Sequence, residues 1–293
     1  MSILARLPRI AVRPTTISVR SCRYYNNNAF SKFKSLEFVR FSPEIRDALN
    51  RKAPIVALES AVISHPDTTY GLPRPDNVEY AARAEQVVRK AGAIPATISI
   101  VNGIIYVGML QAFFGPLSTL NSLKVSRRDL PYVLGMGRLS GGCTIAASMA
   151  IAEMAGIKVL ATGGIGGVHQ SASLMMDISA DVGELGRTNV AVVCSGPRPY
   201  LDVGGTLEFL ETRGVPVVTF GPSQDWGGGG SAVSPEPSQT EGLVEVTETM
   251  ETMLPAFYSR EGRFASPLVI EGAKEAAQII CMSPRPSCAK ACS

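Results

Sequence analysis

The chain has 293 residues, 45% of them hydrophobic, so it is long enough to bury a substantial core. The formal net charge of +3 comes from the first 36 residues, because subtracting their seven basic residues from the 28 Lys and Arg leaves 21 against 25 Asp and Glu. This balance argues against a nucleic-acid polymer as partner, and the apolar runs are too short for a membrane span.

Residues 1–36 contain basic and hydroxyl side chains but no acidic residue. The basic residues are Arg6, Arg9, Arg13, Arg20, Arg23, Lys32 and Lys34. An Arg-rich, acid-free N-terminus able to place apolar residues on one helix face is typical of a mitochondrial presequence. The alternative is a disordered basic tail on a cytoplasmic protein.

The first elements alternate between strand and helix. Residues 54–60 form a short apolar run, which predicts a strand buried on both faces. Residues 76–92 have apolar residues at helical spacing, with Asp76 or Asn77 as cap and Gly92 as the stop. Two β-branched runs in 94–108 surround Asn102 and Gly103, which predicts a hairpin and therefore a mixed sheet.

The alternation continues toward the C-terminus. Residues 126–156 are predicted to be helical, with a face of small side chains. Strands are expected at 157–163, 189–196 and 215–221, and helices from about 180 and at 200–214. We therefore predict an α/β fold, a sandwich of helices around a mixed, mostly parallel sheet.

Residues from about 222 to 243 are rich in Gly, Ser and Pro, so we expect a disordered insertion there. Residues 266–282 return to a helical pattern. One α/β domain over 37–293 is the expected organisation.

Glu59 stands at the carboxyl end of the first predicted strand. Open α/β sheets place ligand-contacting groups at such positions, and desolvation there raises a carboxyl pKa enough for general acid catalysis. The alternative is a surface carboxylate at the mouth of a loop.

Four glycines in residues 161–169 follow a predicted strand and precede His169. Their amides can form an anion nest that suits a phosphate. The spacing lacks the GxGxxG pattern followed by a helix, so a dinucleotide site is disfavoured. His169 is either a ligand contact or an ordinary polar loop residue.

Asp177 and Asp181 stand four residues apart, which aligns two carboxylates on one face if a helix already begins at Asp177. Two carboxylates with water suit a hard ion such as Mg²⁺ or Mn²⁺. The alternative is an acid favoured by the helix dipole. Segment 124–130, earlier in the chain, contains three cations, and either Lys124 or Arg127 is a candidate for facing a phosphate.

Long motifs in this order resemble the pseudouridine-5'-phosphate glycosidase family, also called the indigoidine synthase A family. They are ALESAVISH, PDNVEYAARAEQVVRKAGAIPATISIVNG, KVSRRDLPYV, LATGGIGGVH and MDISADVGEL. The resemblance implies an indigoidine synthase A-like α/β/α fold, a homotrimer, and reversible cleavage of pseudouridine 5'-phosphate to uracil and ribose 5-phosphate with Mn²⁺. It also implies a pseudouridine kinase as pathway partner, and a family sequence that continues beyond the end of this chain.

Roles are also implied for individual residues. Glu59 resembles the proton donor and Asp177 the metal-binding aspartate. The positions that resemble substrate contacts are Lys124, Ile145, Thr162, His169, Ser179, Ala180 and Asp181.

Arg198, in SGPRPYLD, resembles the position of the family's Schiff-base lysine. Cleaving a carbon–carbon glycosidic bond needs an electron sink, which the family supplies by opening the ribose onto a lysine amine. Arginine keeps the positive charge but cannot lose a proton to become a nucleophile. An impaired pseudoenzyme that clamps a sugar phosphate with Arg198 is therefore the alternative. A nicotinamide-dependent oxidoreductase based on the glycine loop leaves the other motifs unexplained.

Overall fold

The computed structural model describes residues 36–65, 72–119, 122–220 and 268–282. All but the last residue of the predicted leader, and the whole predicted insertion at about 222–243, lie outside this part of the chain. No helix within the described ranges has the length and apolar character needed to cross a membrane.

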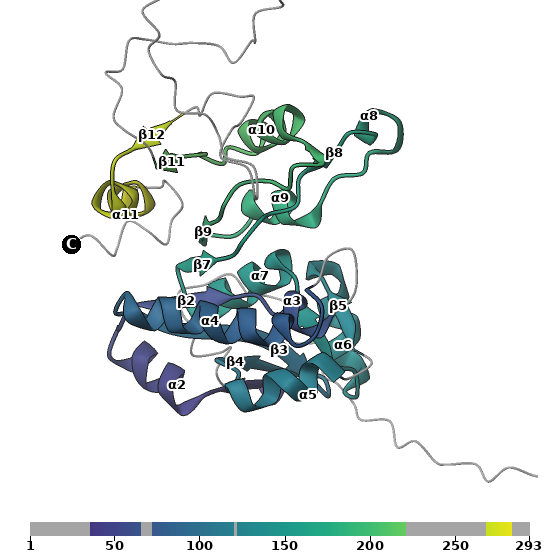
Figure 1. The fold of residues 1–293 in the computed structure, drawn as a ribbon, viewed down its shortest axis with the longest axis vertical. Helices are drawn as coiled ribbons and strands as arrows, with labels where there is room; N and C mark the ends of the chain where they lie inside the picture. The colour runs from purple at the N-terminus through teal and green to yellow at the C-terminus, as the bar shows by residue number, and fades with distance from the viewer. Residues whose placement is uncertain (1–35, 66–71, 120–121, 221–267, 283–293) are drawn as a thin grey trace, which may run out of the picture.

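An eight-stranded sheet forms the centre of the described fold (Figure 1). Its strands are β1 (Val39–Phe41), β2 (Ile55–Leu58), β3 (Ile94–Val101), β4 (Ile104–Val107), β5 (Leu123–Val125), β6 (Gly141–Cys143), β7 (Val159–Ala161) and β9 (Ala191–Val193). β2 pairs in parallel with β3 and β7, and β7 pairs in parallel with β9. β3 is antiparallel to β4 and β6, whereas the β1–β4 and β5–β6 pairs are parallel. The predicted mixed, mostly parallel sheet is confirmed.

Helices cover the sheet and connect its strands. They are α2 (Pro43–Asn50), α3 (Ala61–Ser64), α4 (Asp76–Lys90), η2 (Gln111–Phe113), α5 (Phe114–Thr119), η3 (Arg127–Asp129), α6 (Leu130–Met136), α7 (Ile145–Ala155), α8 (Ala172–Met175), α9 (Ala180–Leu185), α10 (Val203–Thr212) and α11 (Ala273–Met282). Two small sheets pair β8 (Val168–His169) with β10 (Leu201–Asp202), and β11 (Thr219–Phe220) with β12 (Val269–Ile270). Figure 1 shows α2 and α5 in the lower part of the view, α4 between them and β2, and α10, α11 and β12 in the upper part.

Helix α7 is the central helix of the core. Thr144 caps its N-terminus by accepting a hydrogen bond from the Ala147 amide, and Gly156 ends it in the left-handed conformation. Met149 and Ile151 are fully buried and belong to the same apolar cluster as the inner residues of β3. The small side chains predicted for this stretch let the helix pack closely against its neighbours.

The predicted hairpin at Asn102 and Gly103 is confirmed. Both residues have positive φ, and β3 and β4 pair antiparallel on either side of them. This is the backbone conformation that makes Asn-Gly the preferred two-residue turn.

The prediction of continuous helix over 126–156 is wrong, because β6 interrupts it. Gly142 pairs with Ser99 of β3 and with Lys124 of β5. A Cβ at Gly142 would lie 2.6 Å from the carbonyl oxygen of Ser60. Only a glycine permits this approach of β6 to the turn after β2. The pair Gly141 and Gly142 therefore indicates a buried strand and not a helix.

Other boundaries also differ from the predictions. α4 begins at Asp76 without a side-chain cap, and buried Asn77 donates instead to the Ile63 carbonyl. Residues 266–282 are not one helix, since Val269–Ile270 is β12 and the helix begins only at Ala273. In the predicted 200–214 helix, Leu201–Asp202 is a strand, and the Asp202 carboxylate caps α10. The predicted strand at 215–221 is reduced to β11, which pairs with β12 outside the main sheet.

Candidate active site

The carboxyl ends of three parallel strands place the candidate catalytic groups at one edge of the sheet. Glu59 follows β2 and Thr162 follows β7, while Arg198 lies on the loop after β9. Because β2, β7 and β9 are parallel neighbours, these loops leave the sheet side by side.

Glu59 has the environment of a general acid. Burial is the largest cause that raises its pKa, and the charge of Asp181 raises it further, to about 7. The Thr162 hydroxyl donates to Glu59 Oε1 across 3.0 Å and partly opposes this rise, as do the charges of Arg198 and Lys124. The sequence prediction of a desolvated carboxyl therefore has a physical basis in the structure, and a pKa of about 7 suits a general acid that works near neutral pH.

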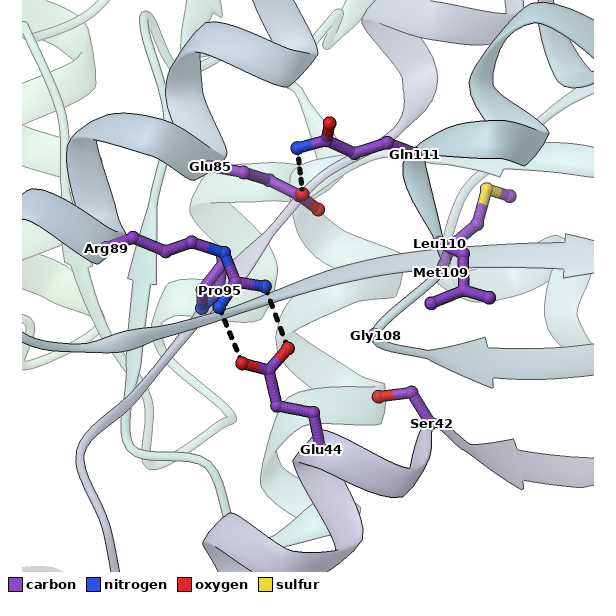
Figure 2. Close-up of a pocket in the computed structure, with 9 residues that line it drawn as sticks. All are labelled: Ser42, Glu44, Glu85, Arg89, Pro95, Gly108, Met109, Leu110 and Gln111. Carbon is purple, nitrogen blue, oxygen red and sulfur yellow. Dashed lines mark hydrogen bonds and ion pairs between the residues drawn. The ribbon is translucent and has the colours of Figure 1, made fainter.

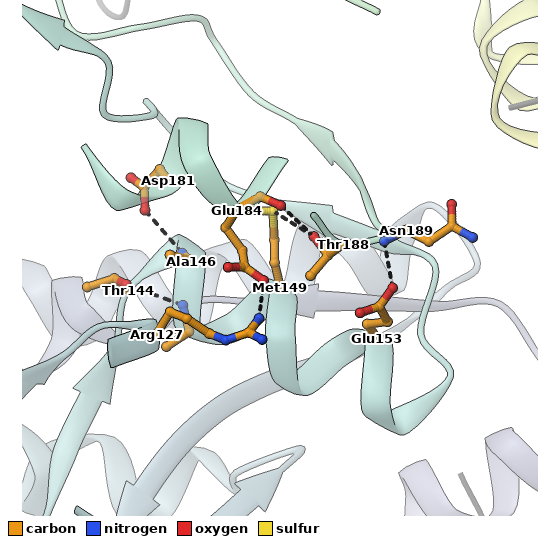
Figure 3. Close-up of polar contacts among 10 residues, drawn as sticks. Arg127, Thr144, Ala146, Met149, Glu153, Asp181, Glu184, Thr188 and Asn189 are labelled. Carbon is orange, nitrogen blue, oxygen red and sulfur yellow. Dashed lines mark hydrogen bonds and ion pairs between the residues drawn. The ribbon is translucent and has the colours of Figure 1, made fainter. Parts of the chain in front are cut away.

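The backbone holds Asp181 in place next to this acid. Its Oδ1 accepts from the Ala146 amide at 3.0 Å in the first turn of α7 (Figure 3), and its Oδ2 accepts from the Gly166 amide at 3.1 Å. A Cβ at Gly166 would lie 2.2 Å from Ser179 Oγ, so the loop needs glycine there. Asp181 is consequently a fixed negative charge that ties α7 to the glycine loop.

The glycine loop is less open to an anion than its sequence predicts. The amides of Thr162, Ile165, Gly166, Val168 and His169 all donate to acceptors within the protein. Gly163, Gly164 and Gly167 are the only positions in 162–169 where an amide is left for a nest.

Asp177 and Asp181 do not share a helix face. α9 begins only at Ala180, so Asp177 precedes the helix and turns toward His169, whose Nδ1 lies 3.7 Å from Asp177 Oδ2. The bridge between Val168 and Ile178 produces this arrangement. The predicted carboxylate pair is therefore wrong.

Asp177 is the candidate metal ligand, and Asp181 does not join it. No group of three or more His, Cys, Asp or Glu side chains suited to a metal occurs in the described part of the chain. Asp177 is half exposed, at 53% of its side chain, beside His169. One carboxylate with water fits Mg²⁺ or Mn²⁺, which keep several water ligands, and does not fit a closed protein cage.

Arg198 is attached to the glycine loop through its backbone. Its amide donates to the Ile165 carbonyl, and Ile165 in turn donates to Gly196. The guanidinium donates to the Tyr200 hydroxyl across 3.4 Å, and the Tyr200 ring lies 6.1 Å from that of His169. Arg198 thus stands between the Glu59 side of the site and the His169–Asp177 side.

The remaining predicted contacts surround these groups. Lys124 lies exposed in β5, and its charge lowers the pKa of both Glu59 and His65. Ile145 is buried at the start of α7, Ser179 caps α9 by accepting from the Asp181 amide, and Ala180 is exposed. Ser179 and Ile145 therefore shape the backbone around Asp181.

Arg127 has a carboxylate partner within the protein. It forms an ion pair with Glu184, whose side chain is only 1% exposed, and this pair ties η3 to α9 (Figure 3). Burial raises the pKa of Glu184, while the charge of Arg127 lowers it. Of the two cations considered from the sequence, Lys124 is the one left for the substrate side.

Sequence reasoning missed several neighbours of the acid. Cys143 is fully buried, and burial together with the Glu59 charge raises its pKa. Ser64 Oγ lies 2.7 Å from His65 Nδ1, close to Lys124. Ser64 and His65 are in the quoted motif around Glu59, whereas Cys143 comes from β6, and the approach of the two segments depends on the close packing of α3 on β6.

Two cavities lie along α4. One of about 300 Å³ reaches Glu59 and Thr162 and is otherwise lined mainly by apolar residues of α4 and the strand ends. The other, of about 290 Å³, contains the bidentate Arg89–Glu44 ion pair and the buried carboxylate of Glu85 (Figure 2). Thr97 and Gln111 donate to Glu85, so the acidic groups of this second cavity already have protein partners and Glu59 remains the candidate acid.

Comparison with known proteins identifies relatives of this chain. Residues 44–228 match the family model described as indigoidine synthase A like protein. A pseudouridine-5'-phosphate glycosidase of Geobacillus kaustophilus is 46% identical over 245 residues, which are 83% of this chain and 70% of the relative. The pseudouridine-metabolizing bifunctional protein of Schizosaccharomyces pombe is 45% identical over 85% of this chain, which covers 28% of that protein.

Solved structures of related proteins also resemble this chain. The prealnumycin C-glycosynthase AlnA, in complex with ribulose 5-phosphate, has a TM-score of 0.65 at 32% identity, covering 84% of this chain and 68% of that chain. An indigoidine synthase A-like protein from Thermotoga maritima has a TM-score of 0.64 at 27% identity, covering 83% of this chain and 68% of that chain. Both share the fold described above.

Proposed function

This chain belongs to the indigoidine synthase A like protein family, and on that premise we propose that it is a pseudouridine-5'-phosphate glycosidase. It cleaves the carbon–carbon bond between ribose and uracil and releases uracil and ribose 5-phosphate in pseudouridine catabolism. The observation that carries the proposal is Glu59, an acid with a pKa of about 7 at the carboxyl edge of the sheet, influenced by the charges of Asp181, Lys124 and Arg198.

Protonation of the departing base explains why the acid needs this environment. When the bond to C5 of uracil breaks, that carbon takes both electrons and has to receive a proton. Glu59 supplies the proton, and a pKa near the working pH gives it both a populated acid form and a strong drive to donate. Thr162 positions the carboxyl by donating to Oε1.

The two cations divide the recognition of the sugar phosphate between them. Arg198 presents a planar guanidinium suited to two parallel hydrogen bonds with phosphate. Lys124 provides a second charge from β5. The amides of the glycine loop that do not donate within the protein add further donors to the same end of the substrate.

We propose that Asp177 holds one Mn²⁺ or a similar hard ion through its carboxylate and water, with His169 beside it. Such an ion, when bound, polarises or orients the pyrimidine carbonyl groups. We also propose a homotrimer, a mitochondrial location, and a separate pseudouridine kinase that supplies the phosphorylated substrate. Sedimentation of the purified chain tests the trimer, and fractionation of cells tests the location.

A direct assay tests the activity. The purified full chain is incubated with pseudouridine 5'-phosphate and Mn²⁺, and uracil is measured by chromatography. The expected result is uracil release that Glu59→Gln lowers by about 10²–10⁴-fold, the usual contribution of a general acid. No uracil at high protein concentration rejects the proposal.

Arg198 supports a second candidate, a sugar-phosphate-binding protein without catalytic activity. Calorimetry with ribose 5-phosphate distinguishes the two, because binding without uracil release favours this candidate. Arg198→Ala should weaken that binding by at least about tenfold if the guanidinium clamps the phosphate.

A further inference from the structure

The structure leaves the electron sink of the proposed reaction unexplained, because Arg198 has no amine that can become neutral. A carbon leaving group departs readily only if the sugar carbon it leaves can form a stabilised cation, and a lysine amine provides this as an iminium. The question is therefore which amine of the chain reaches the carboxyl edge of the sheet.

Most lysines of the described ranges lie at the wrong edge. Lys52, Lys90 and Lys158 precede β2, β3 and β7, which run parallel, whereas Glu59 and Thr162 follow the far ends of β2 and β7. At about 3.3 Å per residue, Lys158 is on the order of 13 Å along the strand from Thr162. Lys274 lies in α11, which Figure 1 shows beside β12 and across β7 and β9 from α4.

Lys124 alone among the described lysines is close to the acid. It pairs with Gly142 of β6, and β6 packs against the turn after Glu59, where the Ser60 amide donates to the Cys143 carbonyl. Val125 is fully buried, so the alternation of a strand turns Lys124 to the opposite side, where it is exposed. Its charge acts on Glu59, which agrees with this placement.

We propose that Lys124 is the covalent nucleophile of this chain and that Arg198 keeps only the charge of the usual position. This inference rests on the proposed function. In the family's reaction one lysine supplies both a positive charge and an amine, whereas in this proposal Arg198 supplies the charge and Lys124 supplies the amine. In this arrangement Arg198 holds the phosphate while Lys124 reacts at the sugar carbon.

The steps balance in atoms and electrons. The Lys124 ammonium first gives one proton to water; its Nζ then attacks C1' of the ribose, the C1'–O4' bond breaks, and a second proton released from nitrogen passes to O4'. The nitrogen lone pair then forms a C=N bond while the bond from C1' to C5 of uracil breaks, and C5 takes the proton of Glu59. Water hydrolyses the iminium to ribose 5-phosphate and the free amine, which returns a proton to Glu59.

Borohydride trapping tests the inference, because it reduces an imine to a stable secondary amine. The full chain is incubated with ribose 5-phosphate, reduced, digested, and mapped by mass spectrometry. We expect one reduced pentose 5-phosphate on the peptide that contains Lys124. Lys124→Arg should remove the adduct and lower uracil release by at least about 10³-fold, since an essential nucleophile cannot be partly replaced. Lys158→Arg, an exposed lysine at the other edge, should retain both.

The outcomes separate this inference from the proposed function. Uracil release without an adduct, with an adduct elsewhere, or undiminished in Lys124→Arg overturns the role of Lys124 and leaves the glycosidase activity standing. Absence of both uracil and adduct in the unmodified chain overturns the proposed function itself. Equal thermal unfolding of Lys124→Arg and the unmodified chain ensures that lost activity is not lost folding.

Discussion

The Thr162 hydroxyl donates a 3.0 Å hydrogen bond to Oε1 of Glu59, and so joins the ends of β2 and β7 at the acid itself. This bond lowers the Glu59 pKa, against burial and the Asp181 charge, which raise it. Thr162 is therefore a positioning residue that also sets the pH range of the acid.

Removing this hydroxyl should move the pH dependence of activity. In Thr162→Val the carboxyl loses a donor that favours its ionised form, so the Glu59 pKa should rise above about 7. The limb of the kcat/KM profile that reports the free acid should shift to higher pH. Thr162→Ser keeps a hydroxyl and should retain the original limb. An unchanged profile in the valine variant would show that the bond does not act on the acid.

Glu59 should also make folding stability depend on pH. Its folded pKa of about 7 lies above the ordinary 4.5, so the folded state binds the proton more tightly than the unfolded state. The contribution of Glu59 to the free energy of unfolding is fully favourable below about pH 4.5 and is lost as the pH rises toward 7. The loss is roughly 3 kcal/mol at most.

Glu59→Gln should remove this loss. Urea unfolding at pH 5 and pH 8 measures the free energy of unfolding of both proteins. The glutamine variant should be more stable than the unmodified chain at pH 8 only. Glu208→Gln, at an exposed position of α10, should show no such difference. A stability gain that is equal at both pH values would contradict a raised Glu59 pKa.

Asp181 should influence Glu59 through its charge. Asp181→Asn removes the negative charge that raises the Glu59 pKa, so that pKa should fall and the activity limb should move to lower pH. Asparagine keeps one acceptor oxygen for the Ala146 or Gly166 amide, so a moderate loss of stability is expected as well.

A matched control separates charge from lost hydrogen bonding. Asp202 also accepts from a backbone amide, that of Gly205, but acts as the cap of α10. Asp202→Asn should therefore lower stability slightly and leave the pH profile in place. If both variants shift the profile equally, the Asp181 charge is not the cause.

The parts of the fold that follow from local patterns were predictable. The strand ending at Glu59, the Asn102–Gly103 turn and the helix from Ala180 depend on apolar alternation, turn chemistry and capping within a few residues. The strand at Gly141–Cys143 was not, because Gly142 meets the backbone of Ser60 and Ala61, about 80 positions earlier in the chain. Short strands of this kind have no periodicity of their own.

The candidate site was likewise predictable only in part. Glu59 is recognisable from its place at a strand end, but the partners that adjust it come from four separate segments, at Lys124, Thr162, Asp181 and Arg198. Spacing wrongly paired Asp177 with Asp181 because the start of α9 is set by the Ser179 cap and the glycine loop. Residue types indicate chemistry, whereas tertiary contacts decide which residues share it.

The Arg127–Glu184 ion pair should be a structural support of the site. Arg127→Met leaves the buried Glu184 carboxylate without its cation, and we expect a loss of roughly 2–3 kcal/mol, less than for a fully buried pair because Arg127 is 42% exposed. Arg128→Met changes a 90% exposed neighbour and should cost little. The double variant Arg127→Met with Glu184→Leu should recover much of the loss, since no unpaired charge remains buried. Urea unfolding of these three variants, of Glu184→Leu alone and of the unmodified chain forms the test, and an additive double variant would show that the two side chains do not interact.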